Sequence, residues 1–283
     1  MPGTLYVVAT PIGNLEDVTI RALRVLRDVS VIAAEDTRRT SRLLQQYSIS
    51  TPTTSLHEHN ERARSAQLLG RLAAGESVAL VSDAGTPAIS DPGARLVAAA
   101  HAEGFRVEPV PGPSAWVAAV SVAGFEADQV LFLGFPPARA NARMAWLQSF
   151  DKDAHRLLVL YEAPHRIRAT LADIFRILGD REIVLCRELT KMHESVVRRP
   201  ISAILERDLP ERGEFTVVIA PQLKGAGACQ ALPSDREIAA EFYQLTKVQA
   251  LGRRAALKEL AAKFRLSART VYQAIERARN SVE

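Results

Sequence analysis

Cysteine is scarce in this sequence, and long apolar runs are missing from it. Only two cysteines, Cys186 and Cys229, occur among 283 residues, and they have no spacing typical of a metal site or a disulfide framework. No apolar run approaches the length that spans a bilayer. The first residues have neither the basic segment nor the apolar stretch of a signal peptide. We therefore expect a cytoplasmic protein with no membrane segment.

The sequence also lacks the glycine-rich loops that bind nucleotides through their phosphates. There is no Gly-x-Gly-x-x-Gly run after the first predicted strand, no Walker loop and no Gly-x-Ser-x-Gly nucleophile motif. His57 and His59 flank Glu58, which suggests a metal site, but no third ligand group follows nearby. We expect no bound metal.

The excess of positive charge is confined to the last fifth of the chain. Residues 233–283 contain ten Lys or Arg and six Asp or Glu, whereas residues 1–232 contain 26 of each kind and are neutral. This distribution indicates an appended module that meets a polyanion. An ordinary solvated helical surface is the alternative.

The most informative stretch is residues 77–93, SVALVSDAGTPAISDPG. Its apolar start, Val78–Val81, predicts a buried strand, and the residues after Gly93 predict a helix. The long loop between them contains two Asp, two Gly and two Pro but no Lys. Ligands bind at such strand-to-helix loops in α/β proteins, so we expect close backbone approach to a polar organic ligand. A surface turn cluster is the alternative.

Strand-like and helix-like segments alternate along the first 221 residues, which predicts an α/β fold. We expect a first α/β domain at 1–123 with a doubly wound sheet, and a second at 124–221 with a mixed sheet. Residues 222–232 are typical of a flexible linker, and residues 233–283 form the basic helical module. Within it, residues 257–275 have the layout of a helix-turn-helix whose second helix presents Arg269. A helical bundle used for docking is the alternative.

Polar loops follow most of the predicted strands of the first domain. Because strand ends on one edge of a parallel sheet meet, we expect these loops to form one crevice with loops of the second domain. The loops are Thr10–Asp17, Glu35–Thr40, Ser55–Glu61, Asp83–Gly93, Pro111–Ala115, Tyr161–Arg166 and Glu188–Glu194.

Five of these motifs, in this order, resemble a known family. They are LYVVATPIGNLED at 5–17, AEDTR at 34–38, SDAGTPAISDPG at 82–93, PGPSA at 111–115 and YEAPHR at 161–166. The chain is similar over about residues 4–221 to the tetrapyrrole-methylase-like (class III) S-adenosylmethionine-dependent methyltransferases. It most resembles those members that methylate the ribose 2′-hydroxyl of a cytidine in bacterial small-subunit (16S) ribosomal RNA. The resemblance implies two α/β domains with S-adenosylmethionine in the cleft between them, and a homodimer.

The resemblance also implies which residues bind the cofactor. The loop after the first strand and the SDAGTP loop, which replaces the family's Gly-Asp-Pro-type loop, would lie beside it. The PGPSA segment would face its methionine end, and the residues before the last strand its adenine. The implied residues are Pro11, Gly13, Asp83, Ala84, Gly85, Thr86, Ser114, Ala115, Gly213, Glu214 and Thr216.

Methyl transfer to a hydroxyl requires alignment of the reacting atoms and removal of the hydroxyl proton. The candidates for the second task are Glu35, Asp36, His57, Glu58 and Lys191. Helix capping is the alternative role for Asp36, and first-turn helix charge is the alternative for Glu58. The candidates for phosphate contacts around a flipped-out nucleotide are Arg38, Arg39, Arg187 and His193, together with Arg269. A solvated helix face is the alternative for Arg38 and Arg39.

We therefore expect a methyltransferase that acts on small-subunit ribosomal RNA or on the assembled small subunit. A methylase of small molecules such as tetrapyrroles, with the same fold and cofactor, is the first alternative. A nucleic-acid-binding regulator with a ligand-sensing body is the second.

Overall fold

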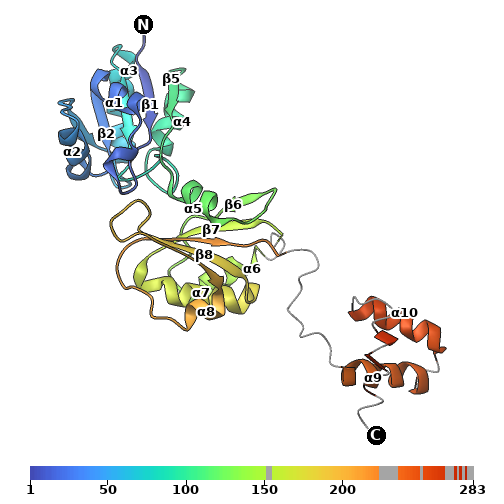
Figure 1. Ribbon diagram of the computed structural model, residues 1–283. Helices are drawn as coiled ribbons and strands as arrows, with labels where there is room; N and C mark the ends of the chain where they lie inside the picture. The colour runs from blue at the N-terminus through green and yellow to red at the C-terminus, as the bar shows by residue number, and fades with distance from the viewer. Residues whose placement is uncertain are drawn as a thin grey trace. The chain divides into compact units, whose positions relative to one another are not determined.

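The computed structural model describes residues 1–150, 155–222, 235–248, 251–264, 271–272, 274–275 and 278. The chain divides into two compact units, Met1–Gln222 and Leu223–Glu283. Unit 1 contains two five-stranded sheets, one built from the first half of its sequence and the other from the second half (Figure 1). The α/β fold predicted from the alternation of elements is confirmed.

The first sheet is parallel in all four of its pairings and has the strand order β3-β2-β4-β1-β5. Its strands are β1 (Thr4–Val8), β2 (Val31–Ala34), β3 (Thr53–Ser55), β4 (Val78–Val81) and β5 (Arg106–Val110). Its helices are α1 (Ile20–Asp28), α2 (Thr37–Gln46), α3 (Glu61–Ala73) and α4 (Ala94–Ala102), with the short 3₁₀ helix η1 (Leu15–Asp17) before α1.

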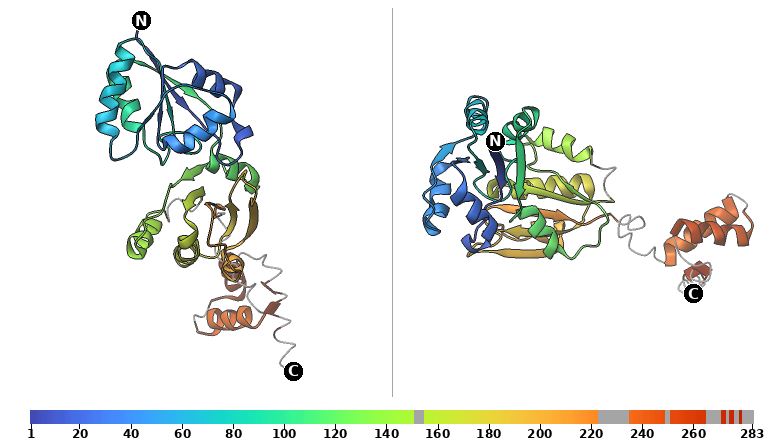
Figure 2. Two further views of the ribbon diagram at one scale, coloured as in Figure 1. Left: turned by 90° about the vertical axis from the view of Figure 1, so that its left-hand side faces the viewer. Right: turned by 90° about the horizontal axis from the view of Figure 1, so that it is seen from above.

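Helices cover both faces of this sheet, as Figure 2 shows, because successive strand residues point to opposite sides. On β2, Ile32 packs in the cluster that includes α1 and α2. Val31, its neighbour, packs in the cluster that includes α3 and α4. When both faces of a sheet are covered, the sequence of each strand is a continuous apolar run. The residues of β2 and β4 are accordingly buried throughout.

The second sheet is mixed, as predicted, and has the strand order β6-β7-β10-β8-β9. The β6–β7 pairing is parallel and the others are antiparallel. The strands are β6 (Val130–Phe132), β7 (Leu157–Glu162), β8 (Glu182–Arg187), β9 (Ser195–Pro200) and β10 (Phe215–Ile219). One face carries α6 (Ala140–Gln148), α7 (Pro164–Leu178) and α8 (Ile201–Leu205).

The other face of the second sheet is covered by α5 (Ala115–Ala123), and this differs from expectation. The sequence placed residues 115–123 in the first domain. In the structure Ala119 and Ala123 pack against Val159, Val184 and Val218 of the second sheet. The small residues of α5 allow this close approach, so the change of sheet comes before the helix and not after it.

Unit 2 is helical in its described residues, with α9 (Asp235–Tyr243), a π-helical segment η3 (Gln244–Val248) and α10 (Arg253–Phe264). Ile238, Leu245, Leu260 and Val271 form its apolar core. The linker predicted at 222–232 lies, after Gln222, outside the described residues, as do the predicted turn and Arg269. Within the described ranges, no helix is both long and apolar enough to cross a membrane.

Candidate active site

A cavity of about 330 Å³ lies among the loops of the two sheets of unit 1. From the first half of the unit it is lined by loops that follow β1, β2, β4 and β5 and by Arg39 of α2. From the second half it is lined by the carboxyl ends of β6, β7 and β8 and by the residues that begin β10. Six of the seven expected loops therefore contribute to one crevice, and the loop Ser55–Glu61 after β3 contributes no lining residue.

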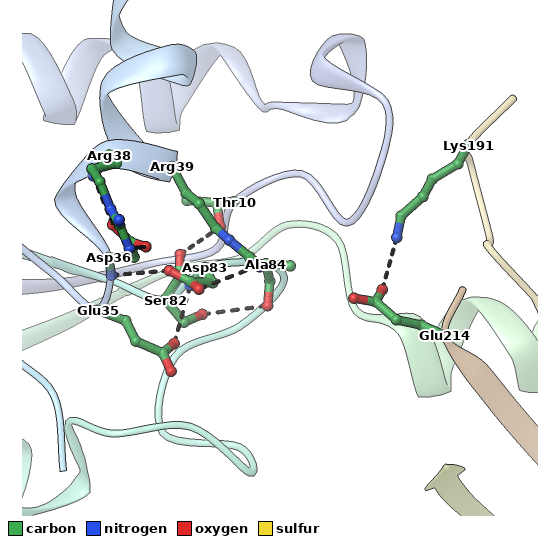
Figure 3. A network of polar contacts seen from close by, with 10 residues as sticks. All are labelled: Thr10, Glu35, Asp36, Arg38, Arg39, Ser82, Asp83, Ala84, Lys191 and Glu214. Carbon is green, nitrogen blue, oxygen red and sulfur yellow. Dashed lines mark hydrogen bonds and ion pairs between the residues drawn. The ribbon is translucent and has the colours of Figure 1, made fainter. Parts of the chain in front are cut away.

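Reciprocal hydrogen bonds lock the loops after β2 and β4 together (Figure 3). The Asp83 amide donates to Glu35 Oε2 at 3.2 Å, and the Asp36 amide donates to Asp83 Oδ1 at 3.0 Å. The Arg39 guanidinium lies 3.4 Å from Asp83 Oδ2. The carboxylates of Glu35 and Asp83 thus hold fixed positions at the cavity wall.

The loop after β4 is also tied to its neighbours on the other side. The Thr10 amide donates to the Gly85 carbonyl at 2.8 Å, and the Gly85 amide donates back at 3.0 Å. Thr86 donates its hydroxyl to the Pro113 carbonyl at 3.3 Å. Gly85 has a φ of 80°, which glycine adopts without strain, whereas Ala88 (66°) and Ser90 (64°) adopt left-handed backbone conformations at a cost. Strain of this kind collects at ligand sites, and this loop lines the cavity along much of its length.

The acidic side chains of the site have contrasting proton affinities. Burial, together with the charge of Glu35, raises the pKa of Asp91 to about 6, against a hydrogen bond from Ser82. Burial also raises the pKa of Glu35. Asp36 differs: hydrogen bonds from Arg38 lower its pKa to about 2, because its carboxylate caps α2 and pairs with the Arg38 side chain at 2.8 Å. Its predicted capping role is therefore present in the structure.

Loop 188–194 approaches the cavity from the second half of the unit. Lys191 Nζ lies 2.9 Å from Glu188 Oε1. It also lies 2.9 Å from Glu214 Oε2, the contact drawn in Figure 3. Although burial opposes it, these two carboxylates raise the pKa of Lys191, so its side chain is an ammonium that donates and does not accept a proton. The Asn14 amide donates to Thr190 Oγ1 at 3.0 Å, which joins this loop to the loop after β1.

Eleven of the residues singled out in the sequence line this cavity. They are Glu35, Arg39, Asp83, Ala84, Gly85, Thr86, Ser114, Ala115, Gly213, Glu214 and Thr216. The others that the structure describes lie outside the lining: Pro11, Gly13, Asp36, Arg38, His57, Glu58, Arg187, Lys191 and His193.

Twelve of the lining residues were not singled out from the sequence, and three of them have side chains that bear on the chemistry of the site. Asp91 and Phe135 line the cavity, and Tyr161 does so with its hydroxyl accepting a hydrogen bond from the Trp116 amide at 3.2 Å. Burial raises the pKa of Tyr161 to about 12, so it stays a neutral phenol. Asp91 and Tyr161 stand inside two of the quoted motifs, which was the available signal. Nothing comparable marked Phe135.

His57 and His59 are not joined by a third possible metal ligand among the described residues. The rings of His57 and His59 are 6.0 Å apart and meet edge to face. In the part of the chain that the structure describes, no three His, Cys, Asp or Glu side chains are grouped so as to hold a metal ion.

Comparison with known proteins defines the class. The family model described as "Tetrapyrrole (Corrin/Porphyrin) Methylases" matches residues 4–205, and the chain belongs to this family. A relative from Pseudomonas aeruginosa, named ribosomal RNA small subunit methyltransferase I, is 49% identical over 77% of this chain and 79% of its own. A relative of the same name from Synechocystis is 44% identical over 96% of both chains. The crystal structure of cobalt precorrin-4 methyltransferase shares the fold, with a TM-score of 0.58 and 16% identity over 77% of this chain and 94% of its own.

The protein is thus a methyltransferase whose methyl donor is S-adenosylmethionine, and the cavity suits that donor. Its charged lining consists of carboxylates and one guanidinium, which matches a cationic sulfonium with an amino-acid tail and not a polyphosphate. A Cβ at Gly85 would come within 3.4 Å of Ile12, another lining residue, so the glycine keeps this part of the cavity wall open. The volume lies at the lower end of the range for small-molecule sites.

Proposed function

We propose that the protein transfers a methyl group to the ribose 2′-hydroxyl of a cytidine in small-subunit ribosomal RNA. The observation that carries this proposal is the similarity to the Synechocystis relative, because it extends over 96% of this chain and so includes unit 2. That relative is named for action on the small subunit's RNA. The basic charge of residues 233–283 supports the same substrate, since a small molecule needs no such module.

S-adenosylmethionine supplies an electrophilic methyl group when bound. The chain's own residues must then align the attacking hydroxyl and take its proton. Among the five candidate residues, we assign proton acceptance to Glu35. It is the one of the five that lines the cavity, and its raised pKa brings it closer to neutral pH, where a general base is most effective.

Three segments are proposed to hold the cofactor. Residues 83–86, 114–115 and 213–216 all line the cavity, and their backbone amides and carbonyls offer the polar partners that an amino-acid tail and an adenine require. Pro11 and Gly13 do not line the cavity. We propose that they support the cofactor site indirectly, by shaping the loop after β1 so that it packs against loop 188–194.

RNA contacts are proposed at the arginines around the cavity mouth and in unit 2. Arg38 has 88% of its side chain exposed and Arg39 61%, at the start of α2. Arg187, His193 and Arg269 complete the proposed set. Such contacts to phosphates position RNA without reading its sequence.

We further propose that the protein is a cytoplasmic homodimer. Val117 and Val122 of α5 are 48% and 55% exposed, and Val130 of β6 is 41% exposed. Apolar side chains in consecutive surface elements favour association with another copy. Light scattering coupled to gel filtration would measure the mass in solution.

The test is incubation with methyl-labelled S-adenosylmethionine and small ribosomal subunits from cells that lack this gene, followed by digestion of the RNA. Label recovered in a 2′-O-methylated cytidine is the expected result. Label in a base, or none in RNA despite cofactor binding, would contradict the proposal. In the second case, tetrapyrrole precursors become the substrates to test.

A further inference from the structure

Phe135 is a large aromatic side chain that lines the cavity and is still 57% exposed. Ile89, from the loop after β4, lines the same cavity and is 39% exposed. The loop after β6, which contains Phe135, packs closely against the loop after β4. A Cβ on Gly134 would lie 3.3 Å from the hydroxyl of Ser90. The cavity therefore has an apolar rim contributed by both halves of unit 1.

The ring of Phe135 is held in place and does not hang freely. Its centroid lies 5.4 Å from that of Tyr161, which in turn lies 5.0 Å from that of Phe132. Phe132 stacks on Trp116 at 5.5 Å, so a row of aromatic rings runs from the apolar cluster beneath α5 to the cavity. After Phe135, the Pro136 carbonyl accepts a hydrogen bond from Arg166 Nη2 at 2.5 Å. A fixed ring costs little entropy when it binds a partner.

The charged groups that line the same cavity indicate the chemistry of that partner. Arg39 brings a cation suited to a phosphate, and Glu35 and Asp91 bring acceptors suited to hydroxyl groups. A flat ring suits the face of a nucleobase. A nucleotide turned out of its RNA strand combines all three features, and enzymes that modify a nucleotide expose it in this way.

We propose that Phe135, with Ile89 beside it, stacks on the base of the nucleotide that is methylated and thereby positions its ribose. This inference rests on the proposed function. It assigns the ring to the RNA substrate and not to the cofactor, because the ring is more than half exposed, whereas Gly85 and Thr216 of the proposed cofactor segments are buried.

The test compares Phe135→Ala, Phe135→Leu and Phe135→Trp with the wild-type full-length protein. Steady-state methylation of small subunits gives kcat and KM, and calorimetry gives the Kd for S-adenosylmethionine. Phe175→Ala is the matched control, since Phe175 is 41% exposed on α7 and does not line the cavity.

We expect Phe135→Ala to lower kcat/KM by roughly 10- to 100-fold, the range for loss of one base–aromatic stack. The leucine variant should lose most of this as well, since it retains apolar bulk without a π face, and the tryptophan variant should retain activity. The Kd for S-adenosylmethionine and the mass in solution should stay at the wild-type values. Phe175→Ala should match the wild type in every measurement.

Four outcomes would overturn the inference. They are wild-type kcat/KM in Phe135→Ala, full activity in the leucine variant, a weakened cofactor Kd, and a changed mass in solution. The third would assign the ring to the cofactor, and the fourth to a second copy of the chain. Failure of the proposed function looks different, because the wild-type protein itself would then leave the RNA unlabelled.

Discussion

The carboxyl of Asp91 binds its proton more tightly in the folded protein than in the unfolded chain. Its pKa is raised to about 6 by burial and by the neighbouring Glu35. An aspartate in an unfolded chain titrates near ~4. The stability that this group contributes is therefore fully present below pH ~4 and is lost as the pH rises through about 6.

We predict that Asp91→Asn, which cannot ionise, raises stability at pH 7.5 by about 1–2 kcal/mol and has little effect at pH 4. Thermal unfolding between pH 4 and pH 8 measures this difference. Asp36→Asn serves as the comparison, because the pKa of Asp36 is lowered to about 2. Its contribution is present above pH ~4 and lost only towards pH 2, so its variant should lose the same stability at pH 7.5 and pH 5. A stability gain for Asp91→Asn that does not change with pH would contradict the assignment.

Glu35 gives a second prediction at this scale. We expect Glu35→Gln to lower kcat by about 10²-fold or more, because a glutamine accepts the Asp83 amide but cannot take a proton. The Kd for S-adenosylmethionine should change little. The acidic limb of the wild-type pH–rate profile, which reflects a carboxyl pKa above its usual value, should disappear.

Glu58→Gln is the control variant for Glu35→Gln, because Glu58 is the other glutamate that the sequence offered as a proton acceptor. Glu58 is exposed and lies outside the cavity lining. Equal kinetic losses in the two variants would mean that neither glutamate is the specific proton acceptor.

At the scale of elements, the loop after β1 and loop 188–194 fit together only because residue 13 is a glycine. A Cβ on Gly13 would lie 2.4 Å from Lys191 Cγ, 2.7 Å from Thr190 Oγ1 and 2.9 Å from the Leu189 carbonyl oxygen. The last of these is backbone, so the two loops would have to separate.

We predict that Gly13→Ala weakens S-adenosylmethionine binding by roughly tenfold and lowers stability by about 1–3 kcal/mol, the cost of overpacking. Calorimetry and thermal unfolding measure the two effects. Gly70→Ala is the control, because a Cβ there meets nothing within 4 Å on α3. It should be neutral, or stabilising by up to about 1 kcal/mol. Unchanged cofactor affinity in Gly13→Ala would mean that contact between the two loops does not shape the cavity.

Elements with a clear pattern could be predicted from the sequence, and those that depend on partners could not. The apolar runs of β2 and β4 and the cap at Asp36 follow from local chemistry. Helix α5 was placed in the first domain, because its nine residues are nearly all apolar and no polar face indicated which sheet it covers. Strand β9, SVVRRP, is an edge strand with exposed arginines and does not read as a strand.

The candidate site divides in the same way. Loops at strand ends could be placed because parallel topology brings them together, and eleven of the predicted residues line the cavity. The sequence could not rank Glu35 above Asp36 as a proton acceptor. Burial raises the pKa of Glu35 and pairing with Arg38 lowers the pKa of Asp36, and both effects arise only in the folded protein. Phe135 was missed because a single phenylalanine after a strand is as often part of a core as of a rim.

At the scale of the whole molecule, the two units have separate apolar cores, and the formal net charge of +4 resides in residues 233–283. A protein that ends at Gln222 retains both sheets and the whole lining of the cavity. It should therefore fold and bind S-adenosylmethionine with the affinity of the full chain.

RNA affinity should respond differently, because basic side chains that bind phosphates release counterions, which makes the affinity depend on salt. We predict that truncation after Gln222 weakens binding to small-subunit RNA by about tenfold or more at low salt. The plot of log K against log salt should become shallower by roughly 0.7 for each phosphate that the truncated protein no longer neutralises. Fluorescence anisotropy with labelled RNA, measured from low salt up to the physiological range, gives both quantities, with cofactor Kd as the control for folding. If the slope of log K against log salt is the same for the full-length and truncated proteins, unit 2 does not bind the RNA backbone. Its basic residues then form an ordinary solvated surface.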